Sequence, residues 1–156
     1  MSVLERFLNY IKIDSPSDPK NAGVTPSTAI QMNVADFLVK EGYAIVDRNV
    51  HRGKNEIDII AEDESFFVFV EVKTRTCLYP ESGEFGIPSR AVDKSKRKNT
   101  VKASRDYLYT HYTDKQPRID VVEVYLLEQK EPTLTPKPIK INHIRNAFDA
   151  RGRKLH

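Results

Sequence analysis

The spacing of apolar residues along the chain predicts three amphipathic helices. Apolar positions recur every three to four residues in 2–12, 25–41 and 90–112, which is the repeat of a helix with one buried face. In the second of these, Pro26 stands at the first helical position and Gly42 follows the end, as is typical of helix boundaries.

Shorter stretches rich in apolar and β-branched residues predict strands. They are residues 43–50, 55–61, 66–75, 118–127 and a short segment after the proline-rich residues 131–138. Helices and strands in this order predict an α/β fold in which a mixed sheet is flanked by helices.

A segment rich in Pro, Ser, Asp and Gly separates the first helix from the rest. We therefore expect residues 1–24 to be an N-terminal appendage, 25–150 to be the main domain and 151–156 to be a basic tail.

The strand at residues 66–75, FFVFVEVKTR, changes character halfway along. Side chains alternate between the two faces of a strand. One face of this strand is wholly apolar, whereas the other begins with Phe67 and Phe69 and continues with Glu71, Lys73 and Arg75. A carboxylate and an ammonium therefore follow directly on a face that should be buried.

The preceding strand forms a hairpin with this one and adds more charge. The register that buries the most apolar surface centres the turn on Asp63-Glu64, and it places Asp58 opposite Phe69 and Glu56 opposite Glu71. This register gathers on one surface the side chains of Glu56, Asp58, Glu71 and Lys73.

Neighbouring carboxylates on one sheet face repel each other unless a cation lies between them. Same-face neighbours lie roughly 5–8 Å apart at Cβ, and Mg²⁺ takes oxygen ligands at about 2.1 Å. The pattern therefore indicates a site for Mg²⁺ or Mn²⁺. The alternative is a ribbon of charged side chains that faces solvent and binds nothing.

Composition and charge narrow the class of protein. Of the 156 residues, 39% are hydrophobic and 30% are charged, which is typical of a globular domain. Apolar runs stay far below the roughly 20 residues of a membrane span, so we expect a cytoplasmic protein that is not membrane-bound. The single cysteine, Cys77, excludes an internal disulfide and a zinc cluster.

Basic residues concentrate in and near the third predicted helix, although the net charge is only +3. Such a cluster is one electrostatic signature of phosphate binding, and an ordinary solvated helix face is the alternative. The candidate nucleic-acid-binding residues are Arg75, Lys94, Lys96, Arg97, Lys98, Lys102 and Arg105.

Longer motifs carry a family resemblance. The D-x12-E-V-K spacing of Asp58, Glu71 and Lys73 resembles the PD-(D/E)xK nuclease superfamily. The stretches NEIDIIAEDESFFVFVEVKTR, EFGIPSRAV, KRKNTVKASRDYL, RIDVVEVY and HIRNAF together resemble the YraN-like family of small bacterial proteins, over residues 27–149. That family is similar to archaeal Holliday junction resolvases.

The resemblance implies a restriction-endonuclease-like three-layer fold and assigns roles to individual residues. Asp58 and Glu71 resemble the metal-binding acids, with the Val72 carbonyl as a further ligand and Glu56 as a support. Lys73 resembles the lysine that orients the attacking water. Gln31 stands where relatives usually carry a glutamate, so one negative charge of the family pattern is missing.

The sequence thus predicts a metal-dependent endonuclease that hydrolyses DNA, with branched or single-stranded structures as candidate substrates. Junction resolution would need two active sites and hence a homodimer. Two alternatives stay open: a nucleic-acid-binding module with little or no catalysis, which Gln31 favours, and a protein-interaction domain that docks through the N-terminal helix.

Overall fold

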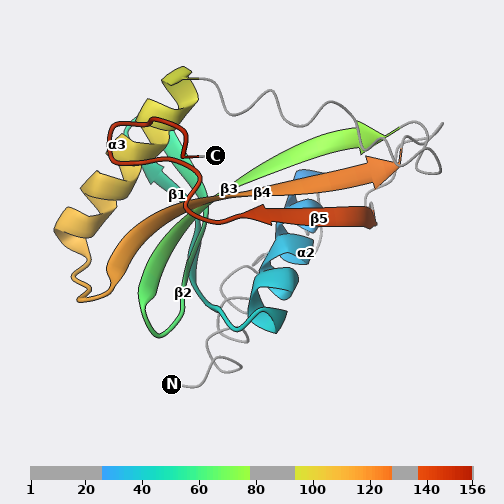
Figure 1. The fold of residues 1–156 in the computed structure, drawn as a ribbon, viewed down its shortest axis with the longest axis horizontal. Coiled ribbons are helices and arrows are strands. Elements are labelled where there is room, and N and C mark those ends of the chain that lie inside the picture. The colour runs from blue at the N-terminus through green and yellow to red at the C-terminus, as the bar shows by residue number, and fades with distance from the viewer. Residues whose placement is uncertain (1–25, 78–93, 128–136, 156) are drawn as a thin grey trace, which may run out of the picture.

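The computed structural model describes residues 26–77, 94–127 and 137–155 (Figure 1). The predicted helix at 2–12, the linker after it, and the Gly- and Pro-containing loop that was predicted at 76–88 fall outside these ranges, apart from residues 76 and 77. In chain order the elements are α2 (Pro26–Lys40), β1 (Ala44–Arg52), β2 (Asn55–Glu62), β3 (Phe66–Cys77), α3 (Lys94–Thr110), β4 (Gln116–Leu127) and β5 (Pro138–Ile144).

The five strands form one sheet in the order β1-β2-β3-β4-β5. β3 and β4 run parallel, and the other neighbouring strands are antiparallel. The predicted mixed α/β arrangement is therefore confirmed at this level. In the described part of the chain neither helix is long and apolar enough to cross a bilayer.

Alternation along the strands divides the core into two layers. Val68 and Val70 of β3 pack on the α2 side, against residues such as Val34 and Leu38. Phe67 and Phe69 of β3 pack with Val101, Ala103 and Tyr107 of α3. The two helices therefore cover opposite faces of the sheet (Figure 1).

A glycine ends α2, as the sequence predicts. Gly42 has a φ of +98°, a conformation that side-chain-bearing residues rarely adopt. It lets Tyr43 N–H donate to the Leu38 carbonyl at 2.9 Å and Gly42 N–H donate to the Val39 carbonyl at 3.0 Å, which caps the helix. The chain then enters β1.

The predicted register of the β2–β3 hairpin is wrong by two residues. The structure pairs Glu62 with Phe67 and Ile59 with Val70, so the turn centres on Glu64-Ser65. The Asp63 carboxylate accepts hydrogen bonds from Ser65 N–H and Phe66 N–H at 2.8 and 2.7 Å and determines this turn. A shift of two keeps every side chain of β3 on its predicted face.

The same shift separates Glu56 from Glu71. The β2–β3 ladder ends at Ile59 and Val70, and Glu56 pairs with His51 of β1 instead. Beyond Ile59, β2 pairs with β1 without β3 beside it, and two-stranded ribbons twist strongly. Ile57 consequently packs in the α3-side layer and not, as alternation predicts, beside Ile59.

The last described residues fold back beside α3 (Figure 1). Phe148 bridges to Lys154, and Leu155 N–H donates to the Ala147 carbonyl at 3.0 Å. Arg97 of α3 donates from Nε to the Gly152 carbonyl at 2.7 Å. Residues 147–155 therefore form a compact turn attached to the helix.

Candidate metal centre at the split between β2 and β3

Asp58 lies where β2 leaves β3. One pair beyond Ile59 and Val70, the shifted register aligns Asp58 with Glu71. The backbone ladder has ended there, and Asp58 Oδ2 accepts a hydrogen bond from Val72 N–H at 2.8 Å. A carboxylate therefore satisfies a β3 amide where β2 no longer pairs with that strand.

Glu71 is the most buried member of this site. It is only 5% exposed, and its Oε2 is buried with no hydrogen-bond partner in the structure. An unsatisfied buried carboxylate oxygen is costly. Glu71 Oε2 is thus an acceptor that a bound cation or donor would satisfy.

Lys96, from the first turn of α3, provides a positive charge. Its Nζ lies 3.4 Å from Glu71 Oε1, and the Lys96 side chain is 40% exposed. The sequence predicted Lys96 as a nucleic-acid contact and gave no sign that it reaches Glu71. Helix α3 and strand β3 are brought together by packing, and sequence spacing does not report that contact.

Burial is the largest cause of a raised pKa in both acids. Burial raises the pKa of Glu71 to about 7, and the charge of Asp58 adds to the rise, while Lys96 and Lys73 oppose it. Burial is also the main cause of the raised pKa of Asp58, which the Val72 amide and Lys96 oppose and the Glu56 charge augments. Two acids with raised pKa values beside each other favour cation binding.

The remaining predicted residues lie around this pair. Lys73 follows on the same face of β3, close enough for its charge to act on Glu71. Val72 faces the α2-side layer with its side chain and contacts Asp58 through its amide. Glu56 acts on Asp58 only through its charge. Within the described ranges no three His, Cys, Asp or Glu side chains form a group that could hold a metal ion by itself.

The basic residues of α3 separate into different environments. Lys96 contacts Glu71, and Arg97 binds the C-terminal turn. The others are exposed on the helix: Lys94, Lys98, Lys102 and Arg105. Arg75, at the far end of β3, is half-buried and close enough to Tyr125 to influence its pKa. Sequence periodicity does not distinguish these environments.

A further buried acid, Glu123 of β4, was missed by the sequence analysis. It is aligned with Lys73 in the parallel β3–β4 ladder and is 2% exposed. Its Oε2 accepts from Tyr125 O–H at 2.9 Å and from Asn142 Nδ2 at 3.2 Å, while Oε1 is buried with no hydrogen-bond partner. In the stretch VVEVY a carboxylate interrupts an apolar strand, as Glu71 does in FFVFVEVKTR. This pattern could have identified Glu123 from the sequence.

Asp120 belongs to a structural cluster on the other face of the sheet. Arg118 donates from Nε and Nη2 to its two carboxylate oxygens at 2.8 Å. His143 Nε2 lies 2.7 Å from Asp120 Oδ2, and Asn146 N–H donates to Oδ1 at 2.9 Å. These contacts satisfy both oxygens of Asp120.

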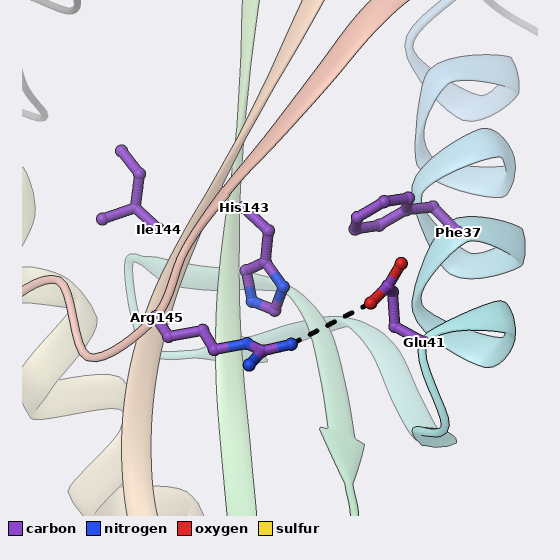
Figure 2. A pocket seen from close by; sticks show the side chains of 5 residues that line it. All are labelled: Phe37, Glu41, His143, Ile144 and Arg145. Carbon is purple, nitrogen blue, oxygen red and sulfur yellow. Dashed lines mark ion pairs between the residues drawn. The ribbon is translucent and has the colours of Figure 1, made fainter.

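A shallow pocket adjoins this cluster and contains no predicted site residue. Figure 2 shows Phe37 of α2 and Glu41, just beyond the end of α2, facing His143 and Arg145, while the side chain of Ile144 points away from them. The Phe37 and His143 rings meet edge to face at 6.1 Å, and Arg145 Nη2 lies 3.9 Å from Glu41 Oε2. Phe37 packs in the α2-side layer, so the pocket is separated by the sheet from Glu71 and Lys96.

The residues at the split fit a divalent cation. Glu71 presents one buried, unsatisfied oxygen, and Asp58 uses only Oδ2 for the Val72 amide. Mg²⁺ is usually held by one or two carboxylates, with water and substrate phosphate completing its six ligands. A pair of carboxylates is therefore sufficient protein coordination for such an ion.

Fold and site together describe a small α/β protein in which buried Glu71, half-buried Asp58 and two lysines lie where β2 and β3 separate. The sequence pattern of the uncharacterised protein family UPF0102 matches residues 32–124. This range contains Asp58, Glu71, Lys73 and Lys96. The chain belongs to the UPF0102 family.

Individual relatives extend the similarity over most of the chain. A UPF0102 protein of Caldanaerobacter subterraneus subsp. tengcongensis is 44% identical over 115 residues, covering 73% of this chain and 86% of its own. One of Chlorobium phaeobacteroides is 35% identical over 135 residues, covering 86% of this chain and 98% of its own. One of Alkaliphilus oremlandii is 42% identical over 115 residues, covering 72% and 87%.

Proposed function

We propose that this protein is a Mg²⁺- or Mn²⁺-dependent nuclease that hydrolyses phosphodiester bonds in DNA. The observation that carries the proposal is the convergence of Asp58 and Glu71 where β2 and β3 part, with an unsatisfied Glu71 oxygen. The resemblance of Asp58, Glu71 and Lys73 to the PD-(D/E)xK pattern adds to it. Under this proposal the mixed α/β fold is of the restriction-endonuclease-like type.

The residues of the site have distinct parts in the proposed reaction. Asp58 and Glu71 hold the ion, which when bound supplies Lewis acidity toward the phosphodiester. Lys73 places its ammonium beside the carboxylates, where it orients the attacking water and offsets negative charge that develops on the phosphate. The β3 strand that carries Glu71 and Lys73 pairs with β2 or β4 along its length, so it is a rigid support.

Exposed basic residues of α3 provide the sequence-independent part of substrate binding. Lys98, Lys102 and Arg105 lie on the solvent-facing side of the helix whose first turn reaches Glu71. Contacts from such residues to phosphates orient a nucleic acid without reading its bases.

Cytoplasmic location and a homodimer with two sites are part of the same proposal.

A nucleic-acid-binding module without catalysis is the second candidate. The observation that favours it is the Lys96–Glu71 ion pair, which balances the buried acid without a metal ion. Gln31 in place of the usual glutamate also reduces the negative charge of the family pattern.

Cleavage assays distinguish the two. Labelled junction, flap, single-stranded and double-stranded DNA are incubated with wild type, Asp58→Ala and Lys73→Ala, with Mg²⁺, Mn²⁺ or EDTA. The nuclease proposal expects metal-dependent cleavage by the wild type that both substitutions abolish. Binding without cleavage in every condition would support the second candidate, and equal cleavage by all three proteins would remove the proposed site.

A further inference from the structure

Lys96 occupies a position that the proposed metal chemistry leaves unexplained. It lies on α3, outside the hairpin that carries Asp58, Glu71 and Lys73, yet its Nζ is 3.4 Å from Glu71 Oε1. The charge of Lys96 acts on both acids of the pair. A single ammonium therefore balances the same carboxylates that would hold a divalent ion.

We propose that Lys96 is the resident counter-cation of the Asp58–Glu71 pair and leaves Glu71 when a divalent ion binds. The inference rests on the metal-binding part of the proposed function and adds a role for a residue outside the Asp58, Glu71 and Lys73 pattern. Lys96 is a positioning residue in this scheme, because it controls access of the ion to the carboxylates.

Two features of the side chain suit it to this exchange. A lysine has a long, flexible stem and a compact charge, so it can swing between neighbouring acceptors. Lys96 is 40% exposed, whereas Glu71 is 6% exposed at the side chain, so the ammonium can move toward solvent while the carboxylate stays in place. The displaced ammonium would remain beside the ion, within reach of a substrate phosphate.

Electrostatics determines the direction of the effect. Divalent cation and ammonium compete for the same negative charge, and each weakens binding of the other. Replacing Lys96 by an uncharged residue should therefore tighten binding of the ion. Replacing an exposed lysine elsewhere on α3 should change the affinity for the ion little, because exposed charges are screened.

The first test measures Mn²⁺ affinity by electron paramagnetic resonance of the free ion, with the full chain, without nucleic acid and at an ionic strength of about 0.15 M, where exposed charges are screened. Lys96→Met is compared with wild type and with Lys98→Met, which removes an equal charge from an exposed position of the same helix. We expect Lys96→Met to bind Mn²⁺ about fivefold more tightly, as for a partly exposed ion pair, and Lys98→Met to match wild type.

The second test reads the response from the wild-type protein itself. Nuclear magnetic resonance of the lysine side chains in the wild type is recorded during titration with Mg²⁺, with Lys96→Arg used to assign the Lys96 signal. The ε-methylene resonance of Lys96 should shift as the ion binds, and that of Lys98 should stay in place.

The outcomes separate this inference from the nuclease proposal. Tighter Mn²⁺ binding by Lys96→Met without DNA cleavage by any protein would support the role of Lys96 and contradict the nuclease. Equal affinity in wild type and Lys96→Met, or an unmoved Lys96 signal while Mg²⁺ binds, would overturn the role of Lys96 alone. Absence of ion binding in both proteins would overturn both proposals.

Discussion

The Asp58 carboxylate accepts a hydrogen bond from the Val72 amide at 2.8 Å, one pair beyond the end of the β2–β3 ladder. This contact joins two strands as they separate, and it holds an acid against the backbone beside Glu71. The separation of β2 from β3 therefore also determines where the carboxylate pair lies.

Loss of Asp58 or Lys73 should abolish metal-dependent DNA cleavage. Asp58→Ala removes a ligand of the ion, and Lys73→Ala removes the ammonium beside it, so we expect each to lower the rate by more than about 100-fold. Glu64→Gln is the matched control, since Glu64 is an exposed acid at the turn of the same hairpin. Cleavage of labelled DNA at saturating Mg²⁺ measures the effect, and an active Asp58→Ala protein would contradict the assignment.

The stability of the metal-free protein should fall as the pH rises from about 4.5 to 7. Burial raises the pKa of Glu71 from 4.5 to about 7, so the folded protein retains a proton that the unfolded chain has released in this window. Folding is then favoured on the acidic side, and ionisation of buried Glu71 costs about 1–3 kcal/mol above pH 7.

Glu71→Gln should remove this dependence. Urea unfolding of wild type and variant in EDTA, at several pH values, gives the difference between their free energies of unfolding. Between pH 4.5 and 7 the free energy of unfolding of the wild type should fall relative to that of the variant. At pH 8, saturating Mg²⁺ should raise the free energy of unfolding of the wild type only. A difference that stays constant with pH would show that Glu71 is not buried in this way.

Asp120→Ala should destabilise the fold and leave the proposed metal site intact. Burial by itself raises the pKa of Asp120, but hydrogen bonds from His143 and Arg118 outweigh it and hold the pKa below its ordinary value. Removing the carboxylate leaves the mostly buried Arg118 without its counter-charge, which costs about 3–5 kcal/mol.

Asp114→Asn is the control, because Asp114 is exposed in the connection that precedes the same strand. Thermal and urea unfolding should show a large loss for Asp120→Ala and none for Asp114→Asn. Where the variant is still folded at low temperature, its Mn²⁺ affinity should equal that of wild type. Weakened ion binding there would mean that Asp120 contributes to the site.

Arg97 and its neighbour Lys98 should behave differently although both are basic. Arg97→Gln removes the hydrogen bond to the Gly152 carbonyl and should cost about 1–2 kcal/mol of stability. The double variant Lys98→Gln/Lys102→Gln should keep wild-type stability and lower the salt dependence of DNA binding by about 1–2 in log–log slope.

Unfolding in urea and DNA binding at several salt concentrations measure the two effects separately. An unchanged salt slope in the double variant would place the nucleic acid on another surface. Wild-type stability of Arg97→Gln would mean that residues 147–155 hold their turn without this bond.

Local chemistry could be predicted from the sequence because it depends on neighbouring residues. Alternation in FFVFVEVKTR indicated which side chains of β3 share a face, and Pro26 and Gly42 indicated the limits of α2. The hairpin register was predicted wrongly because it depends on how Asp63 bonds the turn, and an error of two residues leaves alternation unchanged. That error assigned Glu56, and not Asp58, to the position across from Glu71.

Within the described residues, the chain by itself determined which segments form helices and strands, which side chains of β3 share a face, and the presence of acids on that apolar strand, since these follow from the order of neighbouring side chains. Only the tertiary structure decided that β2 leaves β3 at Asp58, that Lys96 of α3 reaches Glu71, and that Arg97 beside it binds the C-terminal turn. Such contacts join residues far apart in the chain, and their geometry depends on how helix and sheet pack together.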